Sequence, residues 1–188
     1  AAENDSSIVQ MYFRTDEAAD APYSYPSSKI TNSVFTNNTG GYSIHAINAT
    51  TTDNTFINTG PIQIFTRGWA VEYMVQQYKS STISNNVFTN VTGLASIIAG
   101  VDHSASMIIS DNYIDSTDGA GIIAGCMESC GSDEDHALTI SNNTVIRNSG
   151  NGIQIGSVHY FRTTPYYDDA LFVDAPLRGG SLNLAGNS

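Results

Sequence analysis

The stretch Ile83-Ser-Asn-Asn-Val-Phe88 decides the fold, because variants of it recur along the chain. Every copy has an aliphatic residue or Thr at its first position, a polar pair in the middle and an apolar residue at its sixth position, and a Gly follows within five residues. A unit repeated at intervals of this size predicts a solenoid of stacked coils. The other copies are Ile30-Thr-Asn-Ser-Val-Phe35, Thr51-Thr-Asp-Asn-Thr-Phe56, Ile109-Ser-Asp-Asn-Tyr-Ile114 and Ile140-Ser-Asn-Asn-Thr-Val145, and the glycines are Gly40, Gly60, Gly93, Gly119 and Gly150.

A second apolar pattern follows each glycine. Two apolar residues are separated there by one residue, which is the spacing of a strand that buries one face. Each repeat therefore predicts three short strands: one ends at the first Ile or Thr, one carries the Phe, Ile or Val, and one carries this pair. The pairs are Ile44/Ala46, Ile62/Ile64, Ile97/Ala99, Ile122/Ala124 and Ile153/Ile155.

The polar pair between the first two strands predicts a sharp bend. Asn tolerates the left-handed backbone conformation and can hydrogen-bond to its own backbone, so it suits such a turn. When coils stack, the amides of successive asparagines can also hydrogen-bond to one another as an internal ladder. We predict this ladder for Asn54, Asn86, Asn112 and Asn143, with Ser33 taking the position in the first repeat.

The repeats start at residues 30, 51, 83, 109 and 140, at intervals of 21, 32, 26 and 31 residues. Most of this variation lies in the connection that returns to the next repeat, as in a solenoid with loops along one edge. The prediction is an all-β chain, a single-stranded right-handed parallel β-helix of about five to seven coils. Its ends are expected to carry caps or exchanged strands.

The pattern Ile-x-x-Asn-x-Phe/Ile, then Gly, then Ile-x-Ile resembles the coils of the pectate-lyase-like superfamily of parallel β-helix proteins. The resemblance covers about residues 28–157. That superfamily contains polysaccharide lyases, glycosidases, phage spikes, adhesins and structural surface proteins. The resemblance therefore implies the fold and leaves the function open.

The whole chain, residues 1–188, is expected to be one domain. Residues 1–27 contain an apolar stretch, Ile8-Val-Gln-Met-Tyr-Phe13, that we expect to form an N-terminal cap or strand. Residues 28–157 hold the coil repeats, and residues 158–188 are expected to form a last coil, a cap or an exchanged strand. The segment Trp69–Tyr78 fits helical and strand periods equally well.

The charge of the chain argues against two classes of partner. The net charge of −11 would repel nucleic acids and acidic membranes, and no apolar run is long enough to span a bilayer, so we expect neither partner.

Cys126 and Cys130 are the only cysteines. Their spacing permits a disulfide in a secreted chain, which we favour over two buried thiols in a cytosolic one. Asn-x-Ser/Thr sequons make N-glycosylation possible at Asn4, Asn37, Asn48, Asn90 and Asn142.

No combination of residues predicts a catalytic centre. The best carboxylate pair, Asp168-Asp169, would lie on opposite faces of a strand, and only seven Lys and Arg residues are available to complete a lyase site. The run Asp133-Glu134-Asp135-His136 has oxygen ligands suited to calcium, but a solvated loop explains it better because no calcium-loop spacing is present. We assign no catalytic residue, no metal site and no cofactor.

We expect an extracellular or cell-surface protein that is structural and not catalytic, with self-association as its main interaction: a filament or adhesion subunit, with N-glycans as a further option. The regular repeat and the missing catalytic set support this expectation. The alternative is a polysaccharide-degrading or carbohydrate-binding β-helix, for which Trp69, Tyr73 and the pairs Tyr160-Phe161 and Tyr166-Tyr167 offer aromatic surfaces.

Overall fold

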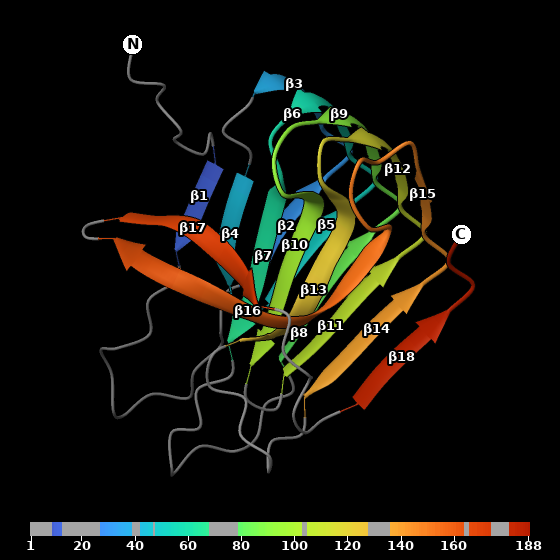
Figure 1. Cartoon of the computed structure of the whole chain (residues 1–188). Helices are drawn as coiled ribbons and strands as arrows, with labels where there is room; N and C mark the ends of the chain where they lie inside the picture. The colour runs from blue at the N-terminus through green and yellow to red at the C-terminus, as the bar shows by residue number, and fades with distance from the viewer. Residues whose placement is uncertain are drawn as a thin grey trace, which may run out of the picture.

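The chain folds as a parallel β-helix made of three sheets, as the repeat predicts (Figure 1). The computed structural model describes residues 9–12, 27–38, 42–46, 48–67, 79–102, 105–127, 136–163, 166–173 and 181–188. Within these ranges every regular element is a strand, and up to residue 163 the strands visit the three sheets in turn. No helix in this part of the chain has the length and hydropathy of a membrane span.

Sheet A lies on one side of the coil stack. Its order is β1-β4-β7-β10-β13-β16-β17, and its pairs are parallel except β16 with β17. The strands are β1 (Val9–Tyr12), β4 (Tyr42–Ala46), β7 (Ile62–Arg67), β10 (Ala95–Asp102), β13 (Ala120–Met127), β16 (Ile153–Thr163) and β17 (Tyr166–Val173).

Sheets B and C complete each coil, and both are parallel throughout. Sheet B has the order β18-β14-β11-β8-β5-β2, and sheet C has the order β15-β12-β9-β6-β3. Sheet B consists of β2 (Ser27–Thr31), β5 (Asn48–Thr52), β8 (Lys79–Ser84), β11 (Ala105–Ser110), β14 (Ala137–Ser141) and β18 (Ser181–Ala185). Sheet C consists of β3 (Val34–Asn38), β6 (Thr55–Thr59), β9 (Val87–Val91), β12 (Tyr113–Thr117) and β15 (Thr144–Ile146).

The core consists of columns of like residues, one from each coil. In sheet B, Ile83, Ile109 and Ile140 stack in register and are fully buried. In sheet C, the ring of Phe56 stacks on that of Phe88 with centroids 4.8 Å apart and on that of Phe35 at 5.0 Å. Such pairs add about 0.5–1.5 kcal/mol each beyond the burial of their area. The apolar positions of the repeat therefore form the interior.

The register corrects one detail of the expected alignment. Ile44 lies beside Ile64, and Tyr42 lies beside Ile62, so the first repeat is shifted by two residues from the pairing that the sequence suggested. The reason is that Tyr42, two residues after Gly40, takes the place that Ile62 has two residues after Gly60. The pair Ile44/Ala46 therefore lies two residues further along its strand than the pair Ile62/Ile64.

The two flanks also join sheets. β1 adds a parallel strand to sheet A beside β4, and so extends the stack at the first coil. β17 folds back antiparallel on β16, whereas β18 returns to sheet B and begins a further coil on β14. The segment Trp69–Tyr78 and most of residues 1–26 lie outside the described residues.

Candidate functional sites: the two turns and the open end

The first turn of every coil, between sheets B and C, has a left-handed residue. The φ angles there lie between 52° and 59° for Asn32, Asp53, Asn85, Asp111 and Asn142, and Gly186 takes the same place after β18 with φ 63°. Asn and Asp adopt this conformation more readily than other L-residues do. The polar pair of the repeat is thus explained by the backbone at its first member.

The second member of each pair faces inward and forms a buried column. Asn54, Asn86, Asn112 and Asn143 are at most 1% exposed. The amide Nδ2 of each residue donates to Oδ1 of the asparagine in the next coil, at 3.0 Å from Asn54, 3.0 Å from Asn86 and 2.9 Å from Asn112. The structure therefore places the four predicted ladder residues on one line along the stack.

Backbone groups complete the hydrogen bonding of this column. Asn112 is typical: its Oδ1 also accepts from the backbone N of Asn86 at 3.0 Å, and its Nδ2 also donates to the carbonyl of Ile83 at 3.0 Å. The amides of Asn86 and Asn112 thus make four hydrogen bonds each, which is the full capacity of that group. A buried polar side chain with all its partners in place stabilises one specific stacking register.

The column has one member that the repeat did not reveal. Asn187 Oδ1 accepts from Asn143 Nδ2 at 3.0 Å and from the backbone N of Asn143 at 3.0 Å. Sequence reasoning missed it because the preceding residue is Gly186 and not Asn or Asp, although Leu184-Ala-Gly-Asn187 keeps the spacing. At the other end, Ser33 Oγ donates to Thr31 of its own coil at 3.0 Å, so the column begins there without an amide.

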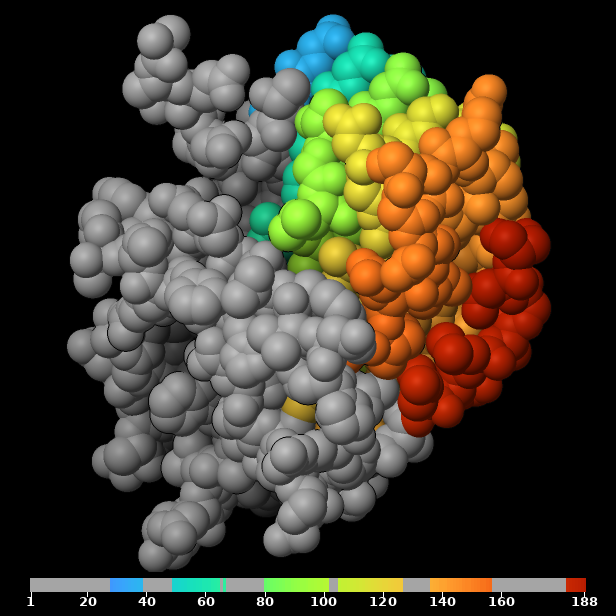
Figure 2. All heavy atoms as spheres, in the orientation of Figure 1, coloured from blue at the N-terminus to red at the C-terminus, as the bar shows by residue number. Residues whose placement is uncertain are grey.

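The stack is open beyond β18. That strand pairs with β14 on one side, and the described residues place no strand on its other side; Figures 1 and 2 show it at the outer edge of the described structure. Leu182 and Leu184 occupy the register positions of Leu138 and Ile140, yet they are 43% and 52% exposed. Core positions thus reach solvent at this end.

The second turn, between sheets C and A, carries an outer column. Asn37, Asn58 and Asn90 have φ between 52° and 56°, and all three are exposed. Asn58 Nδ2 donates to Asn37 Oδ1 at 3.0 Å, and Asn90 Nδ2 donates to Asn58 Oδ1 at 3.2 Å. In the next two coils the position is taken by Ser116 and Arg147, also with positive φ, and the amide column stops.

A groove begins where this outer column stops. It spans three successive coils and has a volume of about 540 Å³. Hydroxyl, amide, carboxylate and guanidinium groups are among the groups that line it. The lining residues are Asn90, Val91, Thr92, Ser116, Thr117, Asp118, Arg147, Asn148 and Ser149.

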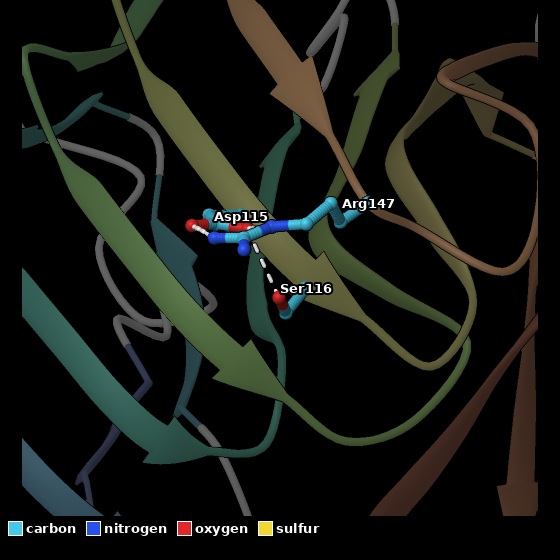
Figure 3. Close-up of polar contacts among 3 residues, drawn as sticks. All are labelled: Asp115, Ser116 and Arg147. Atoms are coloured by element: carbon cyan, nitrogen blue, oxygen red, sulfur yellow. Dashed lines mark hydrogen bonds and ion pairs between the residues drawn. The ribbon is translucent and has the colours of Figure 1, made fainter.

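An ion pair lies beside the groove (Figure 3). The guanidinium of Arg147 contacts both carboxylate oxygens of Asp115, with Nε donating to Oδ1 at 2.7 Å, and Ser116 Oγ donates to the same Oδ1 at 2.9 Å. The Arg147 hydrogen bonds lower the pKa of Asp115, and the hydroxyl of Ser116 acts in the same direction against desolvation. The pKa of Arg147 is raised by its hydrogen bond to Asp115. Asp115 is therefore held as a carboxylate, which suits it poorly to act as a general acid.

The remaining candidate residues are placed only in part. Asp168 and Asp169 lie next to each other in β17. Asp133, Glu134 and Asp135 lie outside the described residues, whereas His136 is buried. Among the described residues, no group of three or more His, Cys, Asp or Glu side chains is arranged to hold a metal ion.

The glycosylation and disulfide candidates are distributed along the stack. Asn142 is exposed at a first turn, and Asn37 and Asn90 are exposed in the outer column. Asn48 lies in β5, and Asn4 lies outside the described residues. Cys126, in β13, is 3% exposed and is not a free cysteine, but Cys130 lies outside the described residues, so the bond between them stays a prediction.

Comparisons with known proteins return no match. No family model, no curated protein and no solved structure matches the chain.

Proposed function

We propose that this chain is a structural, non-catalytic β-helix of the cell exterior that associates with further copies of itself by end-to-end stacking. The observation that carries the proposal is the open end of the stack, where Leu182 and Leu184 continue two core columns into solvent. Filament formation and surface adhesion are both served by such a module, because the repeat that builds one coil also suits the next.

Strand geometry supports the head-to-tail arrangement. Sheet B ends in β18 at one end and in β2 at the other, and all its strands are parallel. The two edges of a parallel sheet are complementary, so β2 of a second copy can pair with β18 in the same direction as the strands within one copy. Exposed strand edges are known to template such pairing, and a heterologous contact of this kind propagates without closing.

The asparagine column supports the same direction. Within the stack, the backbone N and Nδ2 of each column residue donate to Oδ1 of the next one, as Asn143 does to Asn187. Asn187 uses Nδ2 for the carbonyl of Ile140 at 2.9 Å and has one more Nδ2 hydrogen for a following coil. A stacked copy would place Ser33, whose Oγ can accept, over this group.

Apolar residues match at the two ends. Ile30 and Phe35 in the first coil and Val145, Ile153 and Ile155 in the last coil are only partly buried, although they pack on the core. Stacking would remove these surfaces from water, at about 25 cal/mol for each Å² buried. The driving force therefore comes from completing the core columns.

Sedimentation velocity over a range of protein concentrations tests the proposal. We expect species larger than the monomer to grow with concentration, and we expect Leu184→Lys to abolish them by placing a charge on the stacking face. The matched control is Ile108→Lys, since Ile108 is 38% exposed on the outer face of sheet B in the middle of the stack. A wild-type chain that stays monomeric, or a control as disruptive as Leu184→Lys, would refute end-to-end stacking.

A second candidate function, saccharide binding, is favoured by the groove at the second turn. Asp118 and Arg147 both line the groove and supply an acceptor and donors, which suits the hydroxyl groups of a sugar. Calorimetric titration with neutral and acidic oligosaccharides tests it, with Asp118→Asn as the weakened variant and Asp111→Asn, at an exposed first turn, as the control. Absence of binding to every sugar would remove this candidate.

The extracellular location, the N-glycans and the Cys126–Cys130 disulfide belong to the same proposal. Expression through a secretory pathway, followed by intact-mass measurement before and after glycan removal and thiol alkylation, tests all three. We expect occupied sites among Asn37, Asn90 and Asn142, which are exposed. An unglycosylated secreted product with two free thiols would contradict this part.

A further inference from the structure

Asn151-Gly152 is the only Asn-Gly step in a sequence with seventeen asparagines. It lies in the turn that enters β16, and both residues are exposed. We infer that Asn151 is a site of spontaneous self-modification, at which the backbone N of Gly152 converts the side-chain amide into an aspartyl or isoaspartyl residue. This inference goes beyond the proposed function and does not depend on it.

The attacking nitrogen, the backbone N of Gly152, is free of hydrogen bonds to the other described residues. The carbonyl groups of Asn151 and Gly152 accept from the backbone N of Gly121 and Ile122 at 3.1 Å and 3.0 Å. The backbone N of Gly152, in contrast, donates no hydrogen bond to any other described residue. A side chain at 152 would also meet nothing within 4 Å, so the approach to this nitrogen is open.

Other asparagines at the turns differ in this respect, because the nitrogen that would attack them is tied up. After Asn142 and Asn85, the next backbone N donates to Oδ1 of a column asparagine at 3.0 Å. After Asn148 it belongs to Ser149, which donates to the carbonyl of Thr117 at 3.0 Å. The hydrogen bonds that build the coils therefore also protect their asparagines.

The reaction needs no co-reactant other than water. The Gly152 nitrogen loses its proton and attacks Cγ of Asn151, a C–N bond forms, and the Cγ–Nδ2 bond breaks with release of ammonia. Water then adds to one of the two carbonyls of the resulting succinimide and opens the ring to Asp or isoaspartate. Either product adds a negative charge, and isoaspartate lengthens the backbone at the carbonyl that accepts from Gly121.

Timed incubation of the folded protein at mildly alkaline pH tests the inference. Peptide mass spectrometry measures amide loss at each asparagine, and enzymatic methylation by an isoaspartyl methyltransferase reports isoaspartate. We expect Asn151 to convert several times faster than Asn142 and Asn148. In urea-unfolded protein we expect Asn148, which precedes a serine, to speed up and narrow the gap.

Gly152→Ala is the matched variant. Its Cβ is accommodated because nothing lies within 4 Å, so the fold is expected to be unchanged while the methyl group hinders the attacking nitrogen. We expect amide loss at Asn151 to slow several-fold in this variant and to vanish in Asn151→Gln. Equal rates at Asn151 and Asn148 in the folded protein, or a Gly152→Ala variant that reacts at the wild-type rate, would overturn the inference.

Discussion

The two turns of each coil use the same backbone device and differ in what they do with it. Both place a left-handed residue at the bend, with φ near 55° at Asn85 in the first turn and near 54° at Asn90 in the second. The first turn follows this residue with a buried asparagine that is hydrogen-bonded from coil to coil, whereas at the second turn the left-handed residue itself carries the exposed amide. The buried column runs to Asn187, and the outer column stops at Asn90. The buried column thus keeps an asparagine in every later coil, whereas the exposed column does not.

This difference has an energetic reason. Inside the stack, a missing amide leaves donors and acceptors without water, which costs about 1–3 kcal/mol for each unsatisfied group. At the surface, water replaces a lost partner, so the outer column tolerates Ser116 and Arg147 and leaves room for a groove. Residues that bind a ligand are therefore expected at the second turn, where substitutions disturb the stack less.

The largest effect is expected from Asn112→Ala, which breaks the buried column in its middle. The backbone N of Asn86 and the carbonyl of Ile83 both lose their side-chain partner. We expect the free energy of unfolding to fall by about 3 kcal/mol, measured by urea denaturation. A loss below about 1 kcal/mol would mean that the column contributes no more than ordinary surface hydrogen bonds.

A β-branched residue at the left-handed position is expected to lower stability less than Asn112→Ala does, and by the same amount at both turns. Asp111→Val and Asn90→Val should each cost about 1–2 kcal/mol through backbone strain, because φ is 57° and 54° there. The glycine variants at the same positions are the controls and should stay much closer to wild type. Unequal costs would show that the two turns do not share one backbone device.

Asn58→Gly isolates the outer column. It keeps the left-handed backbone and removes the bonds to Asn37 and Asn90. Because all three residues are exposed, we expect a loss of about 0.5 kcal/mol or less, in the same denaturation assay. A loss as large as that of Asn112→Ala would contradict the role given to burial.

The smallest effect is expected from Arg147→Asn, which keeps a residue suited to positive φ and removes the guanidinium. The pKa of Asp115 is lowered in the folded protein, so its stabilising contribution is present above the ordinary carboxyl pKa of about 3.9 and is lost as pH falls through the lowered folded value. Wild type should therefore melt above the variant at neutral pH, and the two melting temperatures should converge in strong acid. If the difference between the two melting temperatures grew as pH falls, it would contradict a lowered pKa of Asp115 in the folded protein.

The fold was largely predictable because it is encoded locally and repeatedly. The aliphatic, asparagine and aromatic positions of each repeat sit in the columns that the pattern of Ile83–Phe88 predicts, since a short period leaves one way to bury them. Asn187 was missed because Gly186 replaces the acid or amide that marks the other turns. The pairing of Ile44 with Ile64 was missed because the third strand was recognised by pairs of aliphatic residues, whereas an aromatic residue, Tyr42, takes the first of these positions in the first coil.

The groove and its ion pair could not be read from the sequence. Asp115 and Arg147 are 32 residues apart, and only the register of β12 on β15 brings them together. A single acid and a single arginine in different repeats give no periodic signal. Positions that depart from a repeat, as Ser116 and Arg147 depart from the asparagine of the outer column, are the signal that could have pointed there.

Electron microscopy of the native protein at increasing concentration tests the central claim, that the open end of the coil stack is an association surface, most directly. We expect rods that lengthen with concentration along the coil axis, with an axial repeat of about 4.8 Å between strands, and single particles for Leu184→Lys. Uniform single particles of the wild-type protein at every concentration would contradict it.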